Sequence, residues 1–183
     1  IDIHSSNIFL QEVPQVRLND DYDEMLLHLA KYMNTDLVWI HPSQTVNEGS
    51  LAYALNQMGI PTMVTESGSA FRIRYEYCRQ IIDGIFSVMA ELGIWKGKTN
   101  GKNDVPFINE DKICYLNCEF SGLFVSYKRL KDRVKKGEII GIIQNPLMGA
   151  TEEEVIAPVD GILMTLREHP SVAEGSLVAR VIG

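Results

Sequence analysis

A repeat in the second half of the chain limits most strongly how this sequence can fold. Glycine followed by an apolar run occurs at Gly122 and again at Gly161. Each run is followed by a Val-x-x-Gly turn, whose glycines are Gly137 and Gly175, and by a second apolar run. Short apolar runs separated by glycine turns are typical of strands. Two such units predict a small β-barrel or flattened sandwich with an internal two-fold repeat.

The first half has a different pattern, in which short apolar runs alternate with segments of helical periodicity. Pro14 excludes a helix around it, so residues 8–18 are expected to form a loop followed by a short extended piece. Strands that alternate with helices predict an α/β layer with a largely parallel sheet. The expected elements are strands at residues 1–4, 36–40 and 61–68 and helices at residues 20–34, 50–58 and 74–92.

A Lys-, Gly- and Asn-rich stretch at residues 96–104 lies between the two halves and is typical of a linker. The predicted domains are therefore residues 1–98, which form the α/β layer, and residues 106–183, which form the repeat-containing β domain. Glu152, Glu153 and Glu154 lie in the connection between the two repeats and are expected to form an acidic tip.

The composition excludes several classes of protein. The 183 residues are 45% hydrophobic and 22% charged, as in globular proteins. A net charge of -7 argues against a nucleic-acid or anionic-membrane surface, and no apolar run approaches the roughly 20 residues of a membrane helix. The three cysteines lack Cys-x-x-Cys spacing, which favours reduced thiols in a cytoplasmic protein. Cys114 and Cys118 are four residues apart and are expected in the core rather than at a metal.

Two candidate site residues lie where a predicted strand meets its loop. The first four residues alternate apolar and polar side chains, which places Asp2 and His4 on one face of a strand that ends at His4. Glu66 ends a later apolar strand, just before a glycine turn. Such strand ends build the sites of open α/β sheets. The alternatives are a purely structural histidine and a glutamate paired with Arg72 or Arg74.

Arg17 and His41 are further candidates. Arg17 lies between two apolar residues and projects to the side opposite to theirs, where its planar guanidinium could bind a substrate carboxylate. A solvated or ion-paired surface arginine is the alternative. His41 begins a long polar loop, residues 41–49, at the end of a predicted strand and is a minor site candidate.

Taken in order, these features resemble the succinylglutamate desuccinylase/aspartoacylase family. The features that carry the resemblance are Asp-x-His at a strand end, Glu-Ser-Gly closing a later strand, a long helix ending in Leu-Gly-Ile, and a biotinyl/lipoyl-like β-barrel. The resemblance covers nearly the whole chain and implies a partial carboxypeptidase-like α/β layer followed by that barrel. It also implies a zinc-dependent hydrolase that cleaves an amide bond of an N-acyl amino acid or a similar small carboxylate.

The resemblance also implies roles for individual residues. His4 would be the third zinc ligand, Glu66 the general base, and Asp2 a residue that orients a zinc-binding histidine ring. The candidate substrate-binding residues, matched only by their nearness to these motifs, are Ser6, Asn7, Arg17, Arg72 and Arg74. The expected partner is a small acyl amino acid, with neither nucleic acid nor membrane, and formation of a homo-oligomer stays open.

Two departures from the family pattern narrow the prediction. The family's first two zinc ligands belong to a Gly-x-His-x-x-Glu motif, and no His-x-x-Glu occurs in this chain. The chain is therefore expected to be the C-terminal part of a hydrolase and to be inactive alone. The connection at residues 145–154 contains no lysine, so the β domain is not expected to be a biotinylated or lipoylated carrier. The alternative function is a non-catalytic binding or scaffold module.

Overall fold

The computed structural model describes residues 1–42 and 49–183, so most of the predicted loop at residues 41–49 lies outside the described residues. The chain separates into two compact units, each discontinuous in sequence. The division into two domains at residues 1–98 and 106–183 stays a prediction. Within the described residues, no helix is long and apolar enough to cross a membrane. Unit 1 consists of Ile1–Ser5, Pro14–Gly68 and Arg72–Glu110, and unit 2 of Ser6–Val13, Ser69–Phe71 and Asp111–Gly183.

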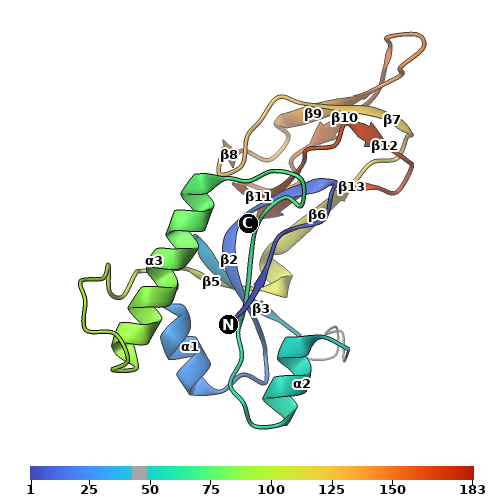
Figure 1. Ribbon diagram of the computed structural model, residues 1–183. Coiled ribbons are helices and arrows are strands. Elements are labelled where there is room, and N and C mark those ends of the chain that lie inside the picture. Colours follow the sequence, from blue (N-terminus) through green and yellow to red (C-terminus); the bar gives the residue numbers. More distant parts are fainter. Residues whose placement is uncertain (43–48) are drawn as a thin grey trace. The chain divides into compact units, whose positions relative to one another are not determined.

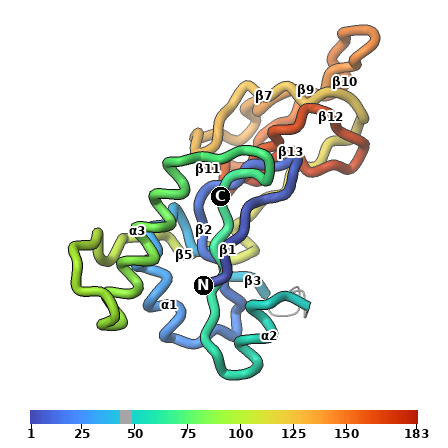
Figure 2. Tube along the Cα trace, in the orientation of Figure 1, coloured from blue at the N-terminus to red at the C-terminus, as the bar shows by residue number. Residues whose placement is uncertain are grey.

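Unit 1 is an α/β layer, as the alternating pattern predicts. Its elements, with β2 reaching into unit 2, are β1 (Asp2–His4), β2 (Leu10–Asn19), α1 (Glu24–Ala30), β3 (Leu37–His41), α2 (Leu51–Gln57), β4 (Val64–Gly68), α3 (Tyr75–Glu91) and β5 (Phe107–Asn109) (Figure 1). The pairs β1–β4, β2–β3 and β3–β5 are all parallel. Figure 2 shows β2 and β3 running beside each other. A parallel sheet brings the carboxyl ends of its strands to one edge, where a site can form.

Strand β2 corrects the prediction for residues 8–18. The sequence predicts a loop and a short extended piece there, whereas β2 is a ten-residue strand. Its ladder with β3 begins at Gln15, and its ladder with a later strand of unit 2 ends at Glu12. Pro14 lies between these two ladders, so its missing N–H interrupts neither of them. A proline at such a position does not end a strand, although it excludes a helix.

Helix α1 begins later than the predicted start at residue 20. Asn19 still pairs with His41 in the β2–β3 ladder, so the chain remains extended through this position. The helix starts after Asp23, whose carboxylate accepts a hydrogen bond from the backbone N–H of Met25 at 2.8 Å. An aspartate at this position satisfies one of the unpaired N–H groups of the first turn. Because the strand ladder holds the chain extended through Asn19, the cap is Asp23 and not one of the earlier polar residues.

Helices α1 and α3 pack together through an unusually close approach (Figure 1). A Cβ at Gly84 of α3 would lie 1.9 Å from the carbonyl oxygen of Met33, just after α1, so only glycine fits there. At the exposed edge of this pair, His28 Nε2 lies 2.6 Å from Glu91 Oε1. The hydrogen bond with His28, with a smaller contribution from Tyr32, lowers the pKa of the Glu91 carboxyl below its ordinary value.

Unit 2 is built from antiparallel strands in two sheets. One sheet has the order β10-β9-β7-β12, and in the other, unit 2 contributes the order β11-β13-β6, with β8 also pairing with β11. Residues 10–12 of β2 pair with β11 as well. The strands are β6 (Ile113–Asn117), β7 (Gly122–Ser126), β8 (Arg133–Val134), β9 (Ile139–Gln144), β10 (Thr151–Ile156), β11 (Gly161–Arg167), β12 (Ser171–Val172) and β13 (Leu177–Ile182), and a 3-10 turn, Glu110–Lys112, precedes them.

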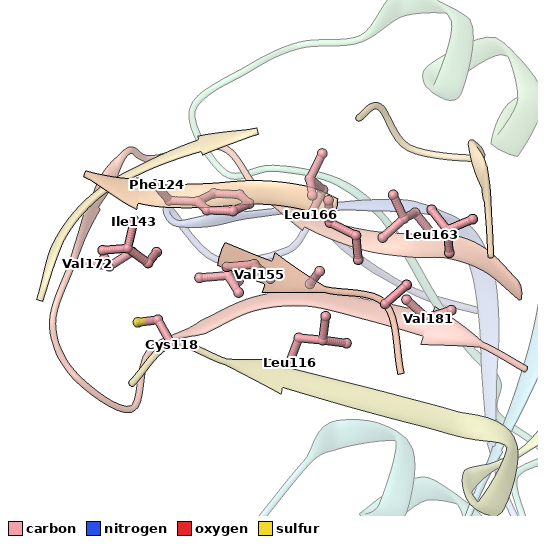
Figure 3. Close-up of a cluster of buried hydrophobic side chains, with 14 residues drawn as sticks. Leu116, Cys118, Phe124, Ile143, Val155, Leu163, Leu166, Val172 and Val181 are labelled. Carbon is pink, nitrogen blue, oxygen red and sulfur yellow. The ribbon is translucent and has the colours of Figure 1, made fainter. Parts of the chain in front are cut away.

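The predicted barrel is not closed. Among the described residues, no ladder joins the two sheets, which enclose one apolar core between them. Figure 3 shows side chains from both sheets meeting in this core, including Phe124 and Val155 from one and Leu163 and Val181 from the other. Alternating apolar residues and glycine turns are the same in a sandwich and in a barrel, so the sequence could not separate them. The internal two-fold symmetry stays a prediction.

The predicted acidic tip is wrong in its location. Glu152 to Glu154 lie within β10, and Glu153 Oε2 accepts hydrogen bonds from the backbone N–H groups of Glu119 and Phe120. The tip of the β9–β10 hairpin is instead apolar, because Leu147 and Met148 are 91% and 79% exposed. Asn145 Oδ1 accepts from both of their backbone N–H groups and so fixes the turn. A side-chain-to-backbone turn of this kind was not recognised in the sequence.

The cysteines are expected to differ strongly in reactivity. Cys118 is 1% exposed in the core of unit 2, and burial raises the pKa of its thiol, whereas Cys78 is exposed. Alkylation needs an accessible thiolate. Iodoacetamide should therefore modify Cys118 at least about 100-fold more slowly than Cys78, because access requires local opening. Peptide mass spectrometry over time measures both rates, and comparable rates in the folded protein would contradict the core assignment.

Candidate functional site

The carboxyl ends of two parallel strands bring His4 and Glu66 together. In the β1–β4 ladder, His4 is the register partner of Glu66. Paired residues of adjacent strands direct their side chains to the same face of the sheet. Gly68 follows with φ of 67°, a left-handed conformation that favours glycine and turns the chain away after Glu66. Both His4 and Glu66 line a pocket of about 600 Å³ in unit 1.

Asp2 and His4 lie on the same side of β1, as the alternation predicts. His4 Nε2 is 3.0 Å from Asp2 Oδ2, and both residues line the pocket. The His4 side chain is 53% exposed, whereas that of Asp2 is 17% exposed. The more buried carboxylate thus orients the more exposed imidazole, which is the arrangement commonly found behind a metal-binding histidine.

Glu66 forms an ion pair with Arg17, an arginine that the sequence did not suggest as its structural partner. Arg17 Nη1 lies 3.1 Å from Glu66 Oε2, and the two side chains are 26% and 11% exposed. Arg74 instead lies 3.8 Å from Glu76, and it also contacts the ring of Tyr77. Arg17 is therefore neither a solvated surface residue nor remote from the predicted site.

Three residues lie behind Arg17: Trp39 and His41 of β3, and Glu110 just after β5. Of these, the sequence suggested only His41. The Arg17 guanidinium carbon lies 5.0 Å from the ring centroid of Trp39, its partner in the β2–β3 ladder. Trp39 Nε1 donates to Glu110 Oε2 at 2.9 Å. The ring of His41 stacks on Trp39 with centroids 4.1 Å apart, and His41 lines the pocket. Trp39 looks like an ordinary core residue in the sequence, and Glu110 is 71 positions away, so no local signal could link them.

The other predicted substrate-binding residues do not line this pocket within the described part of the chain. Ser6 and Asn7 belong to unit 2, where Ser6 is buried and Asn7 Oδ1 accepts from the backbone N–H groups of Phe9 and Leu10. Arg72 and Arg74 belong to unit 1, before α3. A role for these four residues in substrate binding stays a prediction.

Helix α2 contributes pocket residues that the sequence did not single out. Ser50 accepts from the backbone N–H of Tyr53 and so caps the helix, which directs Tyr53 and Asn56 to the pocket. Asn56 exchanges two hydrogen bonds with the backbone of Thr62 and so ties α2 to the segment just before β4. Among the residues of this helix, Tyr53 adds a phenol side chain to the pocket lining. In the sequence it is simply one polar position of a short helix.

The residues present fit only part of a zinc site. Zn²⁺ at a catalytic centre takes about three protein ligands and leaves one position open. No group of three or more His, Cys, Asp or Glu residues suited to a metal occurs at residues 1–42 and 49–183. His4 offers one oriented imidazole, with the carboxylate of Glu66 close by in the same pocket.

Solved structures reproduce the fold over the whole chain. The ectoine utilization protein EutE (DoeB) of Ruegeria pomeroyi, in its product-bound form, matches with a TM-score of 0.84 and 22% identity, over 100% of this chain and 56% of its own. A succinylglutamate desuccinylase of a Silicibacter species matches with a TM-score of 0.85 and 23% identity, over 100% and 57%. The protein has the succinylglutamate desuccinylase/aspartoacylase fold. A further member, from Rhodobacter sphaeroides, matches with a TM-score of 0.82 and 20% identity, over 100% and 57%.

These structural matches confirm, for the fold, the resemblance to the succinylglutamate desuccinylase/aspartoacylase family that the sequence motifs indicated. No protein-family model and no curated relative matches the sequence. The chain spans a little more than half the length of these solved succinylglutamate desuccinylase/aspartoacylase-like proteins.

Proposed function

We propose that this chain carries part of the active site of a zinc-dependent hydrolase that cleaves an amide bond of an N-acyl amino acid or a similar small carboxylate. The observation that carries the proposal is that one pocket collects His4 oriented by Asp2 and Glu66 paired with Arg17. The names desuccinylase and aspartoacylase, borne by solved proteins of the same fold, denote removal of an acyl group and agree with it.

Each of these residues has a distinct task in the proposed reaction. Asp2 accepts a hydrogen bond from the Nε2–H of His4, which leaves Nδ1 of the imidazole as the metal ligand. Zn²⁺, when bound, would polarise the scissile carbonyl and lower the pKa of the attacking water. Glu66 takes the proton of that water and passes it to the leaving amine. Arg17 supplies the cation that recognises a carboxylate of the substrate.

The chain alone is proposed to be inactive. Its described residues supply one well-placed zinc ligand, and Glu66 is needed for proton transfer rather than for coordination. The remaining ligands would come from the rest of a longer parent protein, in keeping with the greater length of the solved structures. Zinc held by three side chains of this chain would contradict this division of the site.

The test compares the full-length parent with this chain in metal analysis and in an amidase assay on a panel of N-acyl amino acids. We expect stoichiometric zinc and turnover in the parent, and neither in the chain alone. His4→Ala in the parent should lower the zinc content, whereas His169→Ala, in unit 2, should not. A parent that folds but neither binds zinc nor cleaves any member of the panel would favour the binding or scaffold module instead.

A further inference from the structure

We propose that Arg17 is an exchangeable partner of Glu66. An anionic ligand entering the pocket replaces Glu66 on the guanidinium, and Glu66 turns toward His4. The purpose of this exchange rests on the proposed function, because it would release the base only when a carboxylate-bearing substrate is in place. The exchange itself is a binding property that requires neither zinc nor turnover.

The existing pair already has the geometry of a contact that a ligand can take over. Arg17 Nη1 lies 3.1 Å from Glu66 Oε2, in a pocket that both residues line. A guanidinium presents five N–H donors in a planar fork and binds a coplanar carboxylate through two parallel hydrogen bonds. A free carboxylate, which no strand holds in place, can align both of its oxygens with this fork.

Arg17 is held in place by contacts other than its pair with Glu66. Its guanidinium lies over the indole of Trp39, whose ring is fixed by the hydrogen bond to Glu110. Arg17 and Trp39 are also direct partners in the β2–β3 ladder, and Trp39 is 1% exposed. A cation over an aromatic face is stabilised by the ring. Trp39 and Glu110 are therefore positioning residues that keep the guanidinium presented when Glu66 leaves it.

The pocket offers both a place for Glu66 to go and room for the ligand. His4 is the register partner of Glu66, so a modest rotation of the glutamate side chain carries its carboxylate toward the imidazole. The cavity measures about 600 Å³, and Leu18, Ala52 and Val64 give it an apolar wall. A small carboxylate with a short alkyl chain fits this combination of a cation and apolar lining.

Trp39 makes the exchange measurable in the 183-residue chain. The chain has two tryptophans, so Trp95→Phe leaves Trp39 as the single indole, in contact with Arg17. We would titrate this variant with butyrate, and with butyramide as the uncharged isostere, at constant ionic strength. A saturable change in Trp39 emission is expected for butyrate alone. Arg17→Met should abolish the change, and Arg17→Lys, which keeps the charge but lacks the fork, should weaken it.

The effect of removing Glu66 distinguishes exchange from simple attraction of an anion. If butyrate must displace Glu66, Glu66→Gln should lower its Kd about tenfold. Asp21→Asn removes the same charge from an adjoining pocket that shares Tyr53 and Asn56 with this one, at a residue with no part in the exchange, and should change the Kd by no more than about twofold. Equal effects of the two variants, binding of butyramide, or no saturable signal would overturn the exchange. An inactive parent would refute the hydrolase while leaving the exchange intact.

Discussion

Replacing Glu66 with glutamine in the full-length parent lowers turnover about 100-fold or more, with its zinc content unchanged. Glutamine fills the same volume and still accepts hydrogen bonds, but it cannot take a proton from water at neutral pH. Glu66 is 9% exposed and lies in β4 beside His4, two residues before the strand ends, which is where such a proton would be transferred. The loss is therefore expected in kcat rather than in metal binding.

The measurement is steady-state kinetics on the purified parent, combined with metal analysis and a thermal unfolding curve. Glu76→Gln is the matched control, because Glu76 is an exposed carboxylate that also faces an arginine. If Glu66 serves only as the structural partner of Arg17, the variant will unfold at a lower temperature and keep near-wild-type turnover at temperatures where it is folded. That pattern would remove Glu66 from the proposed chemistry.

A second large effect is expected in unit 2, where Arg180→Met lowers the free energy of unfolding by about 3 kcal/mol or more. Arg180 Nη1 meets Glu12 Oε1 at 2.6 Å and Thr165 Oγ1 at 3.2 Å, and the Glu12 side chain is only 3% exposed. The Arg180 guanidinium also lies over the ring of Tyr115. Methionine keeps much of the aliphatic volume but leaves the buried carboxylate without its guanidinium.

Urea denaturation of the single and double variants measures this effect. Glu12→Leu combined with Arg180→Met removes both charges, so the double variant should be less destabilised than the sum of the two single variants. Additive losses would show that the two side chains do not interact across the sheet. Asp160→Asn in the same unit has its carboxylate at an exposed turn and is expected to change stability by less than about 1 kcal/mol.

The periodicity of the sequence predicted the helices and strands of this fold better than it predicted which strands pair with one another. The helix expected at residues 74–92 is α3, Tyr75–Glu91, and the strands expected at residues 1–4 and 61–68 are β1 and β4. These features depend on local patterns, which the sequence records directly. The pairing of residues 10–12 with β11 is not local, and neither is the assignment of residues 6–13 to unit 2, because both depend on a strand about 150 positions further along the chain.

The candidate site likewise contains residues that local patterns reveal and residues that only long-range contacts reveal. His4 and Glu66 are visible as polar residues at strand ends, and Asp2 follows from simple alternation. Trp39 and Glu110 act on Arg17 through contacts that only the folded sheet creates, so no motif could reveal them. The ion pair between Arg17 and Glu66 joins residues almost 50 positions apart, so nearness in the sequence did not suggest it.

The close approach at Gly84 has a consequence for how helix α3 can change during evolution or design. The contact is made by the backbone of α3 against the carbonyl of Met33, so it is specified by a missing side chain. The neighbouring Ile82 and Asp83 are exposed and open to substitution, whereas any larger residue at position 84 must push the two helices apart. Comparison of homologous sequences should therefore show one fixed position among freely varying neighbours, and stabilising substitutions in α3 should be sought elsewhere along the helix.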